Sequence, residues 1–461
     1  MMLRLLIRKE ILSHVLSFRF AVTFVIFLVL IFTSIYVTVN GYEQEIAEHG
    51  ARVRAYQEHL KGIITQDDHD RIGWRLFWDD GKLDAVPVSA LSWLGHGMQS
   101  INPIAINTYR WGAKEVDRGL TRNPLLGLLQ VPDFIYVVNV VLSLLAVLFM
   151  FDAVCGEKEA GTLRLTLSNP VPRHLVLLGK WIGGYLVLMI PFLIATIGGL
   201  VYAWSQGVLA ANSEQLTRIG LLLLTSCLYI AVFFNLSLFV SAATDRSATS
   251  LLVCLFLWVT FIIAVPNMAP VTAQILRETP SLHLIESNKE AVDREYQLKI
   301  DQLTQTTGEL AYGKKIEQER ERLEKERDAR KRQWDRYFED RKHDQFSLAK
   351  TLARTSPSGC WIFAAVALTD TGPAAHERLV AARNRLEQTY KEKCDKLEEH
   401  RRQNDWKFPE MTVEEFPALM VQNASAAQSL MDALNDMLIL IILNVVCFMA
   451  AFMRFLRYDV R

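Results

Sequence analysis

The chain alternates between long apolar runs and polar segments of very different length. The first run, from Phe20 to Val39, reads FAVTFVIFLVLIFTSIYVTV and contains no charged side chain. At about 1.5 Å per residue, a helix of this length crosses a hydrocarbon core of roughly 30 Å. Similar runs recur along the chain, and the pattern predicts about six transmembrane helices. Their residues are 20–39, 134–152, 174–204, 219–243, 248–266 and 437–455.

The first apolar run follows a basic stretch with Arg4, Arg8 and Lys9, as in a secretory signal peptide. Its apolar part is too long for a signal peptide, and no cleavage site of small residues follows it. We therefore interpret it as an uncleaved first helix. Residues 1–19 are expected to form an amphipathic helix at the membrane interface. The apolar positions on one face of this helix are Leu3, Leu6, Ile7, Ile11 and Val15.

Lys and Arg residues in the short connections predict the orientation of the chain. Residues 1–19, the loop 153–173 and the tail 456–461 are all basic, and an even number of spans places them on one side. We expect this side to be the cytoplasm, with the spans in a bacterial inner membrane. The outer connections are then a short loop at 205–218 and two large insertions at 40–133 and 267–436.

The two predicted insertions differ in composition. The first begins with a polar helical pattern near residues 42–60 and becomes aromatic and turn-rich (WRLFWDDGKLDAVPVSALSWLGHG), which favours compact mixed structure. In the second, about two thirds of residues 314–344 are charged, with both signs interleaved as in a solvated helix. A further charged run covers 377–402, after the apolar segment CWIFAAVALTD. We expect these two helices to form a coiled-coil-like hairpin, with its apolar elbow against the membrane region.

Composition agrees with an all-α polytopic membrane protein. Hydrophobic residues make up 51% of the 461 residues, and the formal net charge is zero, which argues against a nucleic-acid partner. The chain has six cysteines, of which Cys360 and Cys394 lie in segments predicted to be exposed to water. At most one disulfide could form between them, and the sequence leaves its formation open.

Motifs for catalysis or nucleotide binding are missing from the sequence. Gly156-Glu-Lys-Glu-Ala-Gly161-Thr162 is the nearest approach to a P-loop, and it lacks the phosphate-binding Lys. No zinc-protease, C-x-x-C or G-x-S-x-G motif occurs, so we expect no catalytic residue, cofactor or metal. The spans hold mainly neutral polar groups, which we interpret as interhelical hydrogen bonds. If the protein moves a substrate, a partner supplies the energy. These polar groups are Asn139, Asn235 and Asn444.

The segment from Cys155 to Arg173, CGEKEAGTLRLTLSNPVPR, has the parts of a short helix that could bind a separate ATPase. Glu157 and Glu159 suit a helix N-terminus, where the helix dipole favours negative charge, and Pro170 ends the helical pattern. An ordinary amphipathic loop helix would show the same features. The expected contact surface consists of Thr162, Leu163, Leu165, Thr166 and Leu167.

The longer string FDAVCGEKEAGTLRLTLSNPVPRHLVLLGKWIGG resembles the signature of ABC-2 type exporter permeases. The segments VPVSALSWLGHG and SPSGCWIFAAVALTDTG are similar to outer segments of the subgroup with two large extracytoplasmic insertions. The matching positions are Glu157, Glu159, Gly161, Thr162, Leu163, Leu167, Ser168, Pro170, Val171, Arg173, Gly179 and Lys180.

The resemblance implies a permease subunit that dimerises with a second copy or a paralogue. Separate ATPase subunits would bind ATP and Mg²⁺, membrane lipid would surround the spans, and a periplasmic partner could bind the outer insertions. The residues that the resemblance assigns to ATPase coupling are Glu157, Glu159, Gly161, Thr162, Leu163, Arg164, Leu167, Ser168, Pro170 and Arg173.

Three functions are compatible with this sequence. In the first, the spans form an export pathway for a substrate whose identity stays open, although apolar spans suit an amphipathic molecule. In the second, the spans relay ATP hydrolysis to the outer insertions, which act mechanically on a periplasmic partner. In the third, the protein is a membrane scaffold without energy coupling. We rank them in this order.

Overall fold

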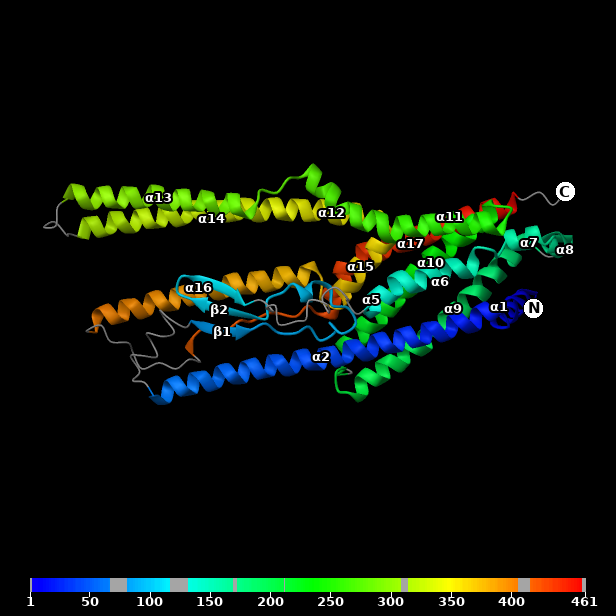
Figure 1. Cartoon of the computed structure of the whole chain (residues 1–461), viewed down its shortest axis with the longest axis horizontal. Helices are drawn as coiled ribbons and strands as arrows, with labels where there is room; N and C mark the ends of the chain where they lie inside the picture. The colour runs from blue at the N-terminus through cyan, green and yellow to red at the C-terminus, as the bar shows by residue number, and fades with distance from the viewer. Residues whose placement is uncertain are drawn as a thin grey trace. The chain divides into compact units, whose positions relative to one another are not determined.

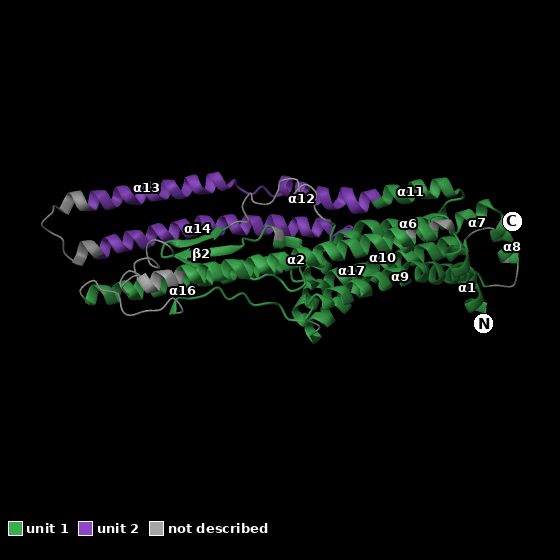
Figure 2. Cartoon of the chain, turned by 60° about the horizontal axis from the view of Figure 1, so that its bottom comes forward, with its two compact units in different colours: residues 1–258, 360–461 green, residues 259–359 purple. Residues whose placement is uncertain are grey.

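The structure is a computed structural model in which the chain forms two compact units. It describes residues 2–66, 81–116, 132–168, 172–210, 212–307, 314–404 and 415–457. Unit 1 comprises residues 1–258 and 360–461, and unit 2 comprises residues 259–359 (Figure 2). Each unit is described separately below.

Six helical segments of the described residues are long and apolar enough to cross a membrane, which confirms the predicted number of spans and the all-α membrane class. They cover Phe20–His59, Phe134–Glu159, Arg173–Ser205, Ser213–Ala243, Ser247–Leu276 and Ala426–Leu456. The helices that contain them are α2 (Phe18–Gln66), α5 (Phe134–Tyr136) with the π-helical η3 (Val137–Leu142), α6 (Ser143–Met150) and α7 (Cys155–Glu159), α9 (Arg173–Ser205), α10 (Ser213–Ala243), α11 (Ser247–Val259) with the π-helical η4 (Thr260–Ala264) and α12 (Val265–Leu276), and α17 (Ala426–Leu456).

The first span continues without a break into the polar region that follows it. Helix α2 has 49 residues, which at 1.5 Å per residue is roughly 73 Å, more than twice the thickness of a hydrocarbon core. The polar helical pattern predicted near residues 42–60 is therefore the continuation of the first membrane helix and not a separate element.

In unit 1, α10 packs against α17 and α6, and α9 packs against α2 and the short N-terminal helix α1 (Met2–Val15). A chain of side-chain hydrogen bonds joins three of these helices. Trp181 Nε1 on α9 donates to Asn235 Oδ1 on α10 at 2.5 Å, and Asn235 Nδ2 donates to Asn444 Oδ1 on α17 at 2.8 Å. Asn139 Oδ1 accepts a hydrogen bond from Tyr229 at 2.8 Å. The interpretation of these asparagines as interhelical hydrogen bonds is confirmed.

A small antiparallel sheet lies at one end of unit 1, and α1 and α7 lie at the other (Figure 1). Its strands β1 (Lys82–Ala85), β2 (Ala105–Tyr109) and β3 (Gly112–Val116) pair in that order, with Leu83 opposite Asn107 and Asn107 opposite Lys114. A 3₁₀ turn, η2 (Gly97–Ser100), precedes β2. Helix α16 (Pro373–Gln403) packs on β2 and β3, so Leu379 joins Val86 and Ile106 in a buried cluster. This region matches the compact mixed structure predicted for the first insertion.

The apolar segment between the charged runs forms helix α15 (Pro357–Leu368). Trp361 is fully buried, stacks on Tyr229 of α10, and donates its Nε1 hydrogen to the Ile135 carbonyl at 3.2 Å. The expected contact of this segment with the membrane helices is therefore observed. Cys360 and Cys394 are both buried thiols, and no disulfide joins them.

Unit 2 contains a helical hairpin formed by the first charged run and the helix that precedes it. Helix α14 (Lys314–Ala353) lies along α13 (Leu282–Thr307), where Lys331 Nζ contacts Asp293 at 2.7 Å and Arg330 contacts Glu295 at 3.5 Å. The second charged run, 377–402, belongs to α16, which packs on the sheet in unit 1. The sequence analysis predicts no helix for α13.

Candidate functional site

The predicted coupling segment folds as two short helices joined by a glycine turn. Helix α7 ends at Glu159 and α8 (Thr162–Ser168) begins after Gly161, which has a φ of 71°. This left-handed backbone costs about 1–2 kcal/mol for a residue with a Cβ. Apart from Gly161 and its two chain neighbours, no atom of the described residues lies within 4 Å of the position that a Cβ would take at Gly161. The backbone conformation, not crowding, therefore requires glycine at this position.

Glu157 connects α7 to two other helices through a lysine. Lys180 Nζ on α9 contacts Glu157 Oε1 at 2.7 Å and Glu10 Oε1 on α1 at 3.2 Å, and the Lys180 side chain is only 5% exposed. Lys9 lies 3.7 Å from the same Glu157 oxygen. A buried charge that loses its partner costs about 3–5 kcal/mol. This cluster therefore holds α1, α7 and α9 together.

Small residues on α9 allow α1 to approach closely. A Cβ on Gly183 would lie 2.7 Å from Glu10 Cβ, and a Cβ on Gly179 would lie 2.9 Å from Leu6 Cβ. At the same contact, burial lowers the pKa of His14, while the Glu10 carboxylate acts in the opposite direction. The predicted apolar face of this N-terminal helix is partly correct, because Leu6 faces α9, but Val15 is exposed.

Lys158 binds the C-terminal end of α10. Its Nζ donates to the carbonyls of Ala242 and Thr244, both at 2.9 Å. The last carbonyls of a helix lack partners within the helix, and a cation there is favoured by the helix dipole. Ser241 Oγ on the same turn accepts from the backbone N–H of Cys155 at 3.2 Å. Helix α7 is thus attached to the end of α10 by side chains from both elements.

Glu159 binds the N-terminal end of α11. Its Oε2 accepts from the backbone N–H of Ser247 at 3.0 Å and from the Ser247 hydroxyl at 2.8 Å. Ser247 is the first residue of α11, where backbone donors lack helical partners and negative charge is favoured. Consecutive residues of α7 thus bind the ends of different span helices, and we call the side chains of Glu157, Lys158 and Glu159 the α7 clasp.

The other predicted coupling residues divide into anchors and exposed positions. Leu163 is fully buried, and Arg173 Nη1 donates to the carbonyl of Leu456, the last residue of α17, at 2.9 Å. Leu165, which the sequence placed on the contact surface, is 69% exposed. Leu167 lies within α8, and Pro170 falls outside the described residues. The exposed polar positions of α8 are Thr162, Arg164 and Ser168.

Several residues of this site are absent from the set predicted by the sequence. Lys180 matches the family signature but is not among the predicted coupling residues, and Lys158 and Glu10 belong to neither group. Two signals were available, because Lys180 lies inside an otherwise apolar run and Glu10 interrupts a basic and apolar helix. The hydrogen bonds to Ser241 and Ser247 depend on tertiary contacts and had no signal in the sequence.

A second polar cluster, the Asp370 junction, lies at the opposite end of α10. Asp370 has a φ of 57°, and its carboxylate binds Arg378 of α16 and lies 3.9 Å from Arg218 of α10. The same carboxylate accepts from the Ala424 N–H at 3.3 Å, just before α17, and the Asp370 carbonyl accepts from Ser89 Oγ at 2.8 Å. The junction therefore joins α10 and the start of α17 to α16 and to the segment between β1 and β2.

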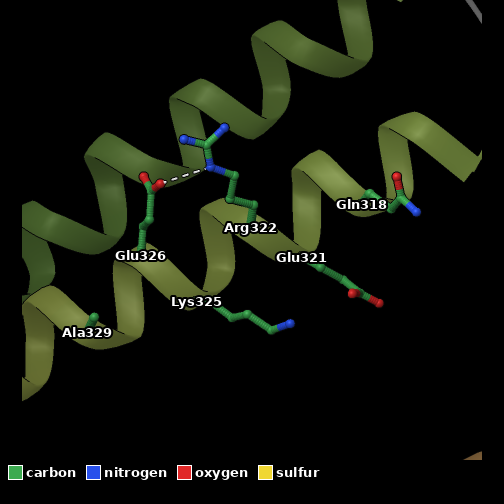
Figure 3. Close-up of a pocket in the computed structure, with 6 residues that line it drawn as sticks. All are labelled: Gln318, Glu321, Arg322, Lys325, Glu326 and Ala329. Atoms are coloured by element: carbon green, nitrogen blue, oxygen red, sulfur yellow. Dashed lines mark hydrogen bonds and ion pairs between the residues drawn. The ribbon is translucent and has the colours of Figure 1, made fainter.

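One hollow beside the described residues offers no binding chemistry. It measures about 500 Å³ and lies along α14 in unit 2, where a single helix lines it. Figure 3 shows Arg322 reaching Glu326, with Glu321 and Lys325 pointing away from this pair. Charges of both signs on one open helix face are typical of a solvated surface.

Six apolar helices with polar groups bound inside the bundle define a multi-pass membrane protein. The family model described as ABC-2 family transporter protein matches residues 4–460. The chain therefore belongs to the ABC-2 family of transporter proteins.

Two curated relatives carry the name "Probable ABC transporter permease protein NosY". The protein from Pseudomonas aeruginosa is 33% identical over 115 residues, which is 24% of this chain and 40% of the relative. The protein from Stutzerimonas stutzeri is 30% identical over 128 residues, covering 26% of this chain and 44% of the relative. The chain thus spans less than half the length of the curated relatives that it matches.

Proposed function

We propose that this chain is the membrane subunit of an ATP-driven exporter in which α8 docks on a separate ATPase subunit. The observation that carries the proposal is the difference between the two helices of the α7–α8 segment. The polar side chains of α7 bind span helices, whereas α8 is anchored by Leu163 and exposes Leu165 beside Arg164. An exposed leucine flanked by a cation is a suitable contact for a groove on another subunit.

The orientation and the partners follow from this assignment. The ATPase subunits bind ATP and Mg²⁺ in the cytoplasm, so α1, α7 and α8 face the cytoplasm of a bacterial inner membrane, and the sheet, α16, α13 and α14 lie outside. Two membrane subunits, either identical or paralogous, face a pair of ATPase subunits.

A mechanical relay is the second candidate function, and two observations favour it. Helix α2 continues far beyond the thickness of a membrane as one rod of 49 residues. The Asp370 junction binds Arg218 of α10 to the segments that lead into α16 and α17. Movement of the span helices would reach the outer parts of unit 1 through these connections and act there on a periplasmic partner.

The docking proposal is tested by purifying the tagged chain from its native membrane in mild detergent. We expect a P-loop ATPase to be recovered in stoichiometric amount, and Leu165→Asp to reduce its recovery at least about tenfold, as for a buried interface anchor. Met420→Asp is the matched control, because Met420 is 79% exposed in unit 1 but lies beyond α16, away from α8. Equal recovery with both variants, or no ATPase with the unchanged chain, would contradict the proposal.

A further inference from the structure

We infer that the α7 clasp consists of positioning residues that distribute the movement of α8 among the span helices, and that it does not bind the ATPase. The inference rests on the proposed function in one respect, because α8 is taken as the ATPase contact. It differs from the expectation drawn from the sequence, in which Glu157 and Glu159 belong to the docking surface.

The contacts of the clasp assign each of its side chains to a different helix. Glu157 reaches α9 and α1 through Lys180, Lys158 reaches the end of α10, and Glu159 reaches the start of α11. Because these residues are consecutive on one helix turn, a rotation or shift of α7 displaces all of these contacts together. A docking residue would instead present its polar atoms outward.

The burial of the central residue supports this assignment. The Lys158 side chain is 7% exposed, and its ammonium group lies on two backbone carbonyls of the α10 C-terminus. A partner subunit could not reach this group without first removing α7 from α10. Lys180 is equally inaccessible, and it keeps Glu157 turned toward the bundle.

The helix ends that the clasp holds are adjacent in the chain. Helix α10 ends at Ala243 and α11 begins at Ser247, so only residues 244–246 separate them. Lys158 and Glu159 therefore hold both ends of one tight reversal between two spans. We expect the reversal to move as a unit with α7 when nucleotide binds to the complex.

The test uses the chain purified with its ATPase subunits in lipid nanodiscs and follows backbone hydrogen exchange with and without nucleotide. In Lys158→Met and Glu159→Ala, we expect ATPase recovery to be unchanged. The nucleotide-dependent change in exchange at residues 240–250 should fall about tenfold, within the usual range of coupling between sites. Glu159→Gln should restore it, because the amide oxygen can still accept from Ser247.

The outcomes separate this inference from the docking proposal. The inference would be wrong if Lys158→Met lost the ATPase while the remaining complex kept its nucleotide-dependent change in exchange at residues 240–250. If no ATPase is recovered with the unchanged chain, the docking proposal is contradicted. The role of the clasp is then tested by hydrogen exchange of the purified chain without an ATPase. Exchange at the Val154 and Cys155 amides, which donate to Ser241 Oγ, should then rise in Lys158→Met. Unchanged exchange there would overturn the inference.

Discussion

The Asp370 junction and the α7 clasp hold opposite ends of the same helix, α10, in different ways. At the junction, one carboxylate is surrounded by two arginines and a backbone N–H, and the Asp370 side chain is 10% exposed. At the clasp, Lys158 and Glu159 bind one helix end each, Glu157 contacts Lys180 within α9, and Glu159 is exposed to solvent. The junction is suited to a fixed connection, and the clasp to one that can change.

The backbone turns beside the clasp and at the junction differ in the same way. Gly161, next to the clasp, has a left-handed φ, and no described atom beyond its two chain neighbours lies within 4 Å of the place where a Cβ would lie. Asp370 takes a left-handed φ although it carries a side chain, and the contacts of that side chain compensate for the cost. The turn at Gly161 therefore costs little free energy to rearrange, whereas the turn at Asp370 is held in place by the contacts of its side chain.

The largest expected effect comes from breaking the junction with Asp370→Asn. Asparagine keeps the shape and tolerates the left-handed backbone, but it leaves Arg218 and Arg378 without their counter-charge. We expect a loss of about 3–5 kcal/mol in the free energy of unfolding. Thermal unfolding in detergent, followed by the fluorescence of buried Trp93 and Trp361, measures it. Asp432→Asn, at an exposed position of α17, should leave the transition unchanged.

A smaller effect is expected from stiffening the turn beside the clasp with Gly161→Ala. The left-handed φ of 71° makes the observed turn about 1–2 kcal/mol less favourable for alanine. ATPase recovery should therefore fall about five- to thirtyfold. Gly207→Ala is the matched control, because Gly207 has a φ of 75° and equally open surroundings between α9 and α10. A similar loss of ATPase in both variants would mean that general destabilisation explains the effect.

The smallest effect concerns the chemistry of Cys394 in α16, at the junction end of unit 1. Burial raises the pKa of Cys394 to about 12, so at pH 8 its reactive thiolate is about a thousandfold rarer than that of an ordinary cysteine. Maleimide labelling of the native protein should be slow and rise about tenfold per pH unit from 8 to 10. Thr162→Cys on exposed α8 should label rapidly. Absence of labelling after unfolding without reductant would indicate a disulfide instead.

The spans could be predicted from the sequence because each is a long apolar run, and the membrane imposes a length that composition alone reveals. The pairing of α14 with α13 could not be predicted, because α14 has few apolar positions and α13 is much less charged than α14, so the pattern of interleaved charges did not mark α13 as a helix. Ion pairs such as that between Lys331 and Asp293 join α14 to α13. A helix with interleaved charges can form such pairs with many other helices equally well.

The helical character of the candidate segment was predicted from the sequence, but its contacts were not. Where the sequence predicts one short helix, the structure has α7 and α8, in which Glu157 and Glu159 contact other helices of unit 1 and Leu163 is buried. A sequence shows that a carboxylate begins a helix, but not whether a neighbouring helix end or another protein receives it. Lys180 was the exception, since a lysine inside an apolar run requires a counter-charge nearby.

The ion pair between Glu10 and Lys180 also bears on how the protein is made. These residues are separated by 170 positions, and the carboxylate comes first. Synthesis proceeds from the N-terminus, so α1 reaches the membrane before α9. Glu10 is therefore present before Lys180, whose charge it neutralises. The cost of inserting a lone lysine reaches about 2.5–3.5 kcal/mol at the centre of a membrane helix, and Lys180 lies nearer the start of α9 at Arg173. The N-terminal helix therefore provides, ahead of time, the partner that lowers this cost when α9 enters the bilayer.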